Sequence, residues 1–105
     1  MKIVFWGKEY EVIDLHSMGI DNYAFDIVSA ISYMYEAVAH KNAILGGDIL
    51  CFENDEYNFT CDNWYSEKIQ PSETLNDALE YLKKYCAYHP NVSKWVIAIT
   101  ICDTY

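Results

Sequence analysis

The sequence predicts an α+β fold, in which a mainly antiparallel sheet packs against two helices. Two segments with apolar residues at three- and four-residue steps predict the helices, and short alternating or β-branched segments predict the strands. The chain of 105 residues is 52% hydrophobic and 16% aromatic, which is enough apolar side chain for a buried core. No composition shift, repeat or low-complexity stretch divides the chain, so residues 1–105 are expected to form a single domain.

The first third of the chain predicts a short hairpin followed by a helix. Residues 1–13 alternate in a strand-like way on both sides of Gly7 and Lys8, which are expected to form a two-residue turn. The helix is expected to run from Asn22, a possible N-cap, to about His40. Its predicted apolar face consists of Ala24, Ile27, Ile31, Met34, Tyr35 and Val38.

The middle of the chain predicts a second hairpin. Gly46 and Gly47, followed by Asp48, interrupt the apolar residues 43–52, so they predict a sharp structural turn ahead of a buried strand over residues 49–52. Residues 53–56 predict an acidic turn, after which residues 57–61 alternate as a strand that pairs back on its predecessor. If aromatic side chains of this hairpin belong to the core, Phe59 and Trp64 are the ones expected there.

The last third predicts a loop, a helix and a central strand. Residues 64–74 contain a proline and a serine and are expected to form a loop. Leu75, Ala78, Leu79, Leu82 and Cys86 then lie on one helical face, and residues 89–91 end that helix. Residues 94–101 are rich in β-branched side chains and lie next to turn residues. The segment is too short for so hydrophobic a helix, so it predicts a central strand.

The charge balance argues against nucleic acid as a partner. Sixteen Asp and Glu residues oppose seven Lys and no Arg, for a formal net charge of -9. Binding a phosphate backbone requires clustered cations, whereas only Lys83 and Lys84 are adjacent. A basic protein surface is a better partner, although negative charge that serves only solubility remains an open alternative.

The cysteines and the N-terminus predict a reduced, cytoplasmic protein. Cys51, Cys61, Cys86 and Cys102 occur in apolar, regularly patterned segments, where a thiol acts as a small apolar side chain. Cys86 and His89 would supply at most two zinc ligands, so no metal and no cofactor is predicted. Residues 1–6 are too short for a signal peptide or a membrane span, so no membrane partner is predicted.

Catalysis has no motif to support it, so the chain is not expected to be an enzyme. The three histidines are expected at a loop or at helix ends, and none has nucleophile spacing from a cysteine or serine. One alternative stays open, a small metal- or ligand-binding hydrolase-like domain. It would use Asp48 with Glu53, His16 or His89 around a pocket.

Acidic and aromatic residues alternate along residues 53–65, a combination typical of protein recognition. Tyrosine and tryptophan supply large contact areas, and carboxylates pair with Lys or Arg of a partner. The alternative is a solvated hairpin whose aromatic side chains belong to the core. The predicted partner-binding residues are Asp48, Glu53, Asp55, Glu56, Tyr57, Asp62, Trp64 and Tyr65.

Three short motifs give the chain a family resemblance. They are DLHSMGIDNYA at residues 14–24, ILGGDI at 44–49 and DNWY at 62–65, followed by the late helix and the final strand. In this order they resemble immunity protein family forty, one of the bacterial immunity proteins of polymorphic toxin and contact-dependent growth inhibition systems. The N-terminal dozen residues lie outside the resemblance.

The resemblance implies a protein that binds a toxin domain in the cytoplasm of the cell that makes it and blocks the active site of the toxin or the access of its substrate and host factors. It transfers no catalytic residue, and it implies that several motif residues hold the fold while toxin-facing residues vary between relatives. Toxins of these systems are frequently nucleases with a basic active-site groove, which an acidic protein would cover as a substrate mimic. Ten tyrosines are many for this length, so both a monomer and a homodimer are compatible with the sequence.

Overall fold

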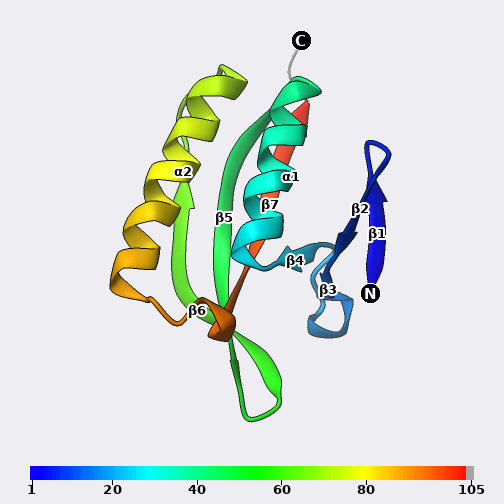
Figure 1. The fold of residues 1–105 in the computed structure, drawn as a ribbon, viewed down its shortest axis with the longest axis vertical. Helices are drawn as coiled ribbons and strands as arrows, with labels where there is room; N and C mark the ends of the chain where they lie inside the picture. Colours follow the sequence, from blue (N-terminus) through cyan, green and yellow to red (C-terminus); the bar gives the residue numbers. More distant parts are fainter. Residues whose placement is uncertain (104–105) are drawn as a thin grey trace.

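The computed structural model describes residues 1–103, and within them two α-helices cover one face of a five-stranded antiparallel sheet (Figure 1). A separate two-stranded hairpin lies beside the first helix, so the α+β prediction is confirmed. The strands are β1 (Lys2–Phe5), β2 (Lys8–Glu11), β3 (Ile13–Asp14), β4 (Tyr23–Phe25), β5 (Asn42–Glu53), β6 (Glu56–Tyr65) and β7 (Trp95–Asp103). The helices are α1 (Ile27–Ala39) and α2 (Pro71–Tyr88), with 3₁₀ turns at His16–Met18 and Val92–Lys94. The order of the large sheet is β3-β4-β7-β5-β6.

The N-terminal hairpin is confirmed and adds aromatic rings to the core. β1 pairs with β2, and the turn consists of Trp6 and Gly7, both with positive φ, one residue earlier than expected. The Phe5 ring lies edge-on to the Tyr33 ring of α1 with centroids 5.1 Å apart. Tyr10 is buried in the same cluster. The hairpin is therefore held by packing as well as by its own ladder.

Helix α1 begins later than the sequence predicts. Asp26, rather than Asn22, caps it, because its carboxylate accepts a hydrogen bond from the Ser29 amide at 2.7 Å. The Asn22 side chain instead donates to the Ile99 carbonyl at 3.1 Å, beside the pairing of β4 with β7. The expected first helical turn is thus a strand, since pairing with a distant strand overrides the local helical pattern.

The glycine pair does not form a turn, so that prediction is wrong. Strand β5 runs without interruption through Gly46 and Gly47, which pair with Tyr65 and Trp64 of β6. A Cβ atom on Gly46 would lie 2.3 Å from the Trp64 carbonyl oxygen, and one on Gly47 would lie 2.3 Å from the Trp64 ring. The glycines are required because the two strands and the indole approach so closely.

The second hairpin is confirmed, but its register is irregular. Asn54 and Asp55 form the tip with positive φ, as a two-residue hairpin turn requires. Residues 60–62 of β6 then lie opposite Ile49, and Cys61 also has positive φ. Phe59 precedes this bulge and Trp64 follows it. Trp64 is buried, as expected, whereas Phe59 is 48% exposed and not part of the core.

Helix α2 and strand β7 agree with the prediction in type and differ at their ends. The expected loop over residues 64–74 is shorter, since β6 continues to Tyr65 and α2 begins at Pro71. The Thr74 hydroxyl accepts a hydrogen bond from the Ile44 amide at 2.9 Å and so ties α2 to β5. Strand β7 is central, between β4 and β5. The expectation of apolar surroundings is wrong for two cysteines, because Cys61 and Cys102 are exposed.

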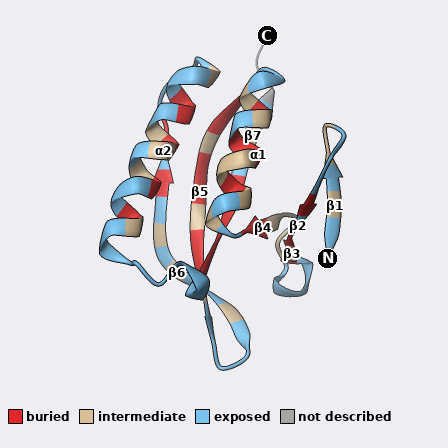
Figure 2. Cartoon of the chain, viewed as in Figure 1, coloured by how far each residue is buried: buried red, intermediate tan, exposed pale blue. Residues whose placement is uncertain are grey.

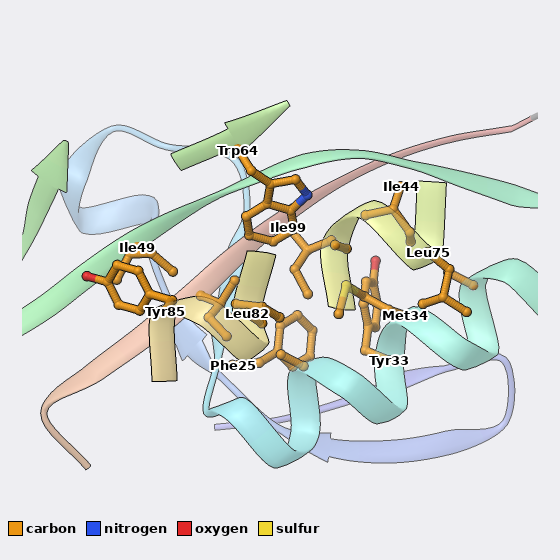
Figure 3. Packing of buried hydrophobic residues seen from close by; sticks show 14 of the residues in the cluster. Phe25, Tyr33, Met34, Ile44, Ile49, Trp64, Leu75, Leu82, Tyr85 and Ile99 are labelled. Carbon is orange, nitrogen blue, oxygen red and sulfur yellow. The ribbon is translucent and has the colours of Figure 1, made fainter. Parts of the chain in front are cut away.

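Buried residues occupy both faces of the sheet (Figure 2). The larger cluster fills the space between the sheet and the two helices, where Phe25, Met34, Ile49 and Leu82 meet (Figure 3). The smaller cluster lies on the opposite face and consists of Leu15, Ala24, Leu50, Val96 and Ala98. No helix in the described part of the chain is long and apolar enough to cross a membrane.

Candidate functional site

The three sequence motifs, far apart in the chain, meet at the sheet. Residues 44–49 and 62–65 are neighbouring stretches of β5 and β6, in which Asp48 pairs with Asn63. Residues 14–24 contribute Leu15 and Ala24 to the cluster on the helix-free face. Much of the motif sequence is therefore used to build the sheet and its packing.

The helix-free face of β5 and β6 carries exposed aromatic side chains. Paired residues of neighbouring strands project to the same side, and Leu50 belongs to the helix-free cluster, so the alternate residues beside it share that face. Phe52, Phe59 and Tyr65 are 43%, 48% and 75% exposed. We call this surface the open sheet face, defined by Asp48, Phe52, Tyr57, Phe59, Asn63, Tyr65 and Thr100.

The open sheet face is hollowed near its motif residues. A shallow depression of about 480 Å³ is lined by Asp48, Asn63, Tyr65 and Thr100. Beyond it, the Phe52 and Tyr57 rings contact each other with centroids 4.9 Å apart. This surface combines large aromatic side chains with a half-buried carboxylate, as a protein-binding surface does.

The hairpin tip, residues 53–56, adds a concentrated negative charge. Glu53, Asp55 and Glu56 are exposed, and Figure 1 shows this hairpin extending beyond both helices. Glu53 and Glu56 are direct partners across the ladder, an arrangement of like charges that costs stability. No lysine occurs between Lys41 and Lys68, so this part of the chain supplies no cation of its own. A pair of like charges that destabilises the fold is the kind of local cost expected at a functional site.

Trp64 is the one predicted site residue that is buried. Its side chain lies on the helix side of the sheet (Figure 3), where it is 9% exposed. The indole stacks on Tyr81 of α2 with centroids 5.1 Å apart. Its indole N–H is buried and has no hydrogen-bond partner within residues 1–103. Trp64 therefore packs β6 against α2 and is not part of the exposed surface.

Asp62 also faces the helices, where it binds Tyr85. The Tyr85 hydroxyl donates to the Asp62 carboxylate at 2.8 Å, and Figure 3 shows this ring at the edge of the cluster. Burial, and then the nearby Asp62 carboxylate, raise the pKa of Tyr85 to about 12. The Tyr85 ring also stacks on His89 with centroids 4.2 Å apart.

A pocket of about 520 Å³ lies between the hairpin and the C-terminal end of α2. Its lining includes Glu53 and Asp62 from the hairpin side and Tyr85, Tyr88, His89 and Lys94 from the helix side. On the helix side of this pocket, only His89 was a candidate from the sequence, as part of the hydrolase alternative, and Tyr85, Tyr88 and Lys94 were not predicted. The four-residue spacing of Tyr81, Tyr85 and His89 was a visible signal, since it places three rings on one helical face.

The residues of the hydrolase alternative do not line one pocket. Asp48 lines the depression on the open sheet face, and Glu53 and His89 line the pocket beside α2. His16 binds instead to Asp14 and Asp21. Within residues 1–103, no group of three or more His, Cys, Asp or Glu side chains is placed to hold a metal ion.

The His16 site closes the turn whose Leu15 and Ile20 pack in the smaller cluster on the helix-free face of the sheet. One imidazole nitrogen bonds Asp14 and the other lies 2.9 Å from Asp21. These two hydrogen bonds, that of Asp14 first, raise the pKa of His16. The His16 backbone amide, followed by its side chain, lowers the pKa of Asp14. The arrangement holds residues 14–21 together next to buried Leu15.

An acidic hairpin tip beside an exposed aromatic sheet face is a combination typical of protein-binding surfaces. Its family is given by comparison, because residues 14–101 match the family model for immunity protein 40. The chain therefore belongs to this family of immunity proteins, as the three motifs indicated. Membership implies an immunity function exerted by binding a cognate toxin. No curated protein and no solved structure matches the chain.

Proposed function

We propose that this immunity protein neutralises a toxin nuclease by covering its basic active-site groove with the hairpin tip and the open sheet face. The system is a polymorphic toxin or contact-dependent growth inhibition system, and the encounter takes place in the cytoplasm. Inhibition needs no catalysis by the immunity protein, because occupying the groove is sufficient to exclude a nucleic acid substrate.

The hairpin tip is the observation that carries this proposal. Glu53, Asp55 and Glu56 are exposed, the hairpin backbone that carries them extends beyond both helices (Figure 1), and no lysine lies in the surrounding sequence. A groove that binds phosphates presents clustered Lys and Arg, so a projecting acidic loop matches it in charge. The mutual repulsion of Glu53 and Glu56 is relieved when a cation of the partner binds between them.

The predicted site residues then divide into three roles. Glu53, Asp55 and Glu56 would pair with cations of the groove, and such charges act mainly on the association rate and on specificity. Asp48, Tyr57 and Tyr65, with the exposed Phe52 and Phe59, would supply the contact area beside the tip. Trp64 would act indirectly by supporting β6, and Asp62 lies at the pocket beside α2.

The decisive test is a charge reversal that preserves folding. Glu53→Lys with Glu56→Lys exchanges one like-charge pair for another, so the cross-strand repulsion is retained and stability should change little. The variant should bind the neighbouring-gene toxin domain at least about a hundredfold more weakly, since like charges then face each other across the interface. Calorimetry or surface plasmon resonance measures affinity, and a growth assay measures protection.

A matched control separates position from net charge. Glu9→Lys with Glu73→Lys makes the same change in net charge at exposed positions on β2 and α2, away from the hairpin tip at residues 53–56. This control should bind within about threefold of the natural protein. Equal weakening in both variants, or full protection by the hairpin variant, would contradict docking through the hairpin tip. Affinity that does not fall between low and physiological salt would contradict the electrostatic account.

A further inference from the structure

The pocket beside the C-terminal end of α2 combines three features that favour a planar cation. Carboxylates of Glu53 and Asp62 lie on its hairpin side, and the rings of Tyr85 and His89 lie on its helix side. The third feature is the helix end itself, whose last carbonyl groups carry partial negative charge. α2 has no basic residue in its last turn to neutralise that charge.

The aromatic side of the pocket is ordered by stacking. Trp64, Tyr81, Tyr85 and His89 form successive stacked pairs with centroids 5.1, 5.9 and 4.2 Å apart. Trp95 meets the Tyr85 ring edge-on and donates its indole N–H to the His89 carbonyl at 3.2 Å. The ring faces are therefore fixed before any ligand arrives, which lowers the entropy cost of stacking against them.

The carboxylate of Asp62 is oriented as well. The Tyr85 hydroxyl donates to one of its oxygens at 2.8 Å, which leaves acceptor capacity on this carboxylate for a second donor. Glu53 adds a second carboxylate from β5. Lys94 also lines the pocket, yet among residues 1–103 it forms no ion pair with either carboxylate. The Tyr85 ring lies between the rings of Tyr81 and His89, so the pocket leaves carboxylate acceptors and the outer face of the His89 ring for a partner.

We propose that this pocket receives an arginine side chain of the toxin, which anchors the complex beside the hairpin tip. A guanidinium group pairs with carboxylates through several N–H donors and stacks on aromatic faces, whereas an ammonium is more strongly hydrated and does not stack. Glu53 belongs both to the pocket and to the hairpin tip, so one basic partner surface can engage the two together. The inference rests on the proposed toxin binding and adds the chemical identity of one contact.

The pocket is tested first without the toxin. The isotope-labelled full chain is titrated with N-acetylarginine amide and, in a matched series, with the uncharged N-acetylcitrulline amide. The arginine probe should shift the amide signals of Tyr88, His89 and Lys94 saturably at millimolar concentration, and the citrulline probe should not. Asp62→Asn should abolish the shifts, and it keeps an oxygen for the Tyr85 hydroxyl. Equal shifts from both probes, or arginine shifts only at residues outside the pocket, would overturn the inference.

The toxin complex gives a second test with effects of opposite sign. Asp62→Asn should weaken binding about tenfold, and Lys94→Gln should strengthen it a few fold, because it removes a cation that competes with the arginine. Tyr88→Ala, at a position 83% exposed, should weaken binding without affecting folding. If the reversal of Glu53 and Glu56 abolishes binding while these three variants leave it unchanged, the arginine pocket is refuted and hairpin docking stands. If the natural protein does not bind the toxin, the proposed function fails and the arginine titration still decides the pocket.

Discussion

Replacing the two strand glycines by alanine tests what the glycine motif does. In an ordinary strand position such a change would stabilise the protein by about 0.4–1 kcal/mol, because alanine restricts the unfolded chain. Neither Gly46 nor Gly47 has positive φ, so backbone strain does not oppose alanine at either position. The Cβ contacts with Trp64 at 2.3 Å do oppose it.

The two positions should differ in magnitude because the opposing atoms differ. At Gly46 the obstacle is the Trp64 backbone carbonyl, which cannot rotate away, so the strands must separate and the ladder suffers. Gly46→Ala should cost about 3 kcal/mol of folding free energy, the upper end for overpacking. At Gly47 the nearest obstacle is the Trp64 ring, which is held against Tyr81 and can shift slightly, and the Ala98 carbonyl oxygen follows at 3.0 Å. Gly47→Ala should cost about 1–2 kcal/mol.

Urea denaturation in a Trp64→Leu background separates the two mechanisms. Removing the ring should rescue most of the cost of Gly47→Ala, giving a coupling free energy of about 1 kcal/mol in the double-mutant cycle, while the tight contact with the Ala98 carbonyl oxygen remains. It should not rescue Gly46→Ala, because the backbone carbonyl of residue 64 remains. If Gly47→Ala is as stable as the natural protein, or if its cost is the same with and without the indole, the close-packing explanation of the motif is wrong.

Two further predictions concern titrating groups. The raised pKa of His16 means that its bonds to Asp14 and Asp21 stabilise the fold at pH values below the ordinary histidine pKa, and this stabilisation is lost as pH rises through the raised value. His16→Gln should therefore lower the urea midpoint at about pH 5.5 and change it little at about pH 8.5; an equal loss at both would contradict the prediction. Tyr85, with a pKa of about 12, should ionise after the exposed tyrosines in an alkaline absorbance titration, and the fold should lose stability as pH rises above the ordinary tyrosine pKa. Because burial also raises the pKa of Tyr33 and of Tyr81, Tyr85→Phe should shrink the late step without removing it, and it should cost about 1 kcal/mol at neutral pH. A late step of unchanged size in this variant would contradict the assignment to Tyr85.

The segments predicted correctly are those in which the apolar residues follow one helical or strand period throughout. Helix α2 has Leu75, Ala78 and Leu82 buried against the sheet as expected, because helical spacing alone places them on one side. Strand β7 is central as expected, since a short β-branched segment suits a position buried on both faces. The acidic turn was also visible, because Asn54 and Asp55 tolerate the positive φ of a two-residue turn.

Errors arose where a distant segment determines the local structure. Residues 23–25 follow a helical pattern yet form β4, because β3 and β7 pair with them on either side. Gly46 and Gly47 suggest a turn locally, and only Trp64, on the next strand, explains why they are glycines. Phe59 alternates as a core residue should, but it projects from the open sheet face and remains exposed.

The sequence by itself determined the fold class, the acidic character, the hairpin tip and, through three short motifs, the family. These depend on composition, on the spacing of residues and on local turn chemistry, and none of the three requires knowledge of contacts between distant segments. Only the tertiary structure decided that the Trp64 ring packs on Tyr81 of α2, that Asp62 binds Tyr85, and that rings from α2 form a pocket with the hairpin carboxylates. Those facts depend on which face of a strand meets which helix, and a bulge at residues 60–62 sets that face in a way that no local pattern reveals.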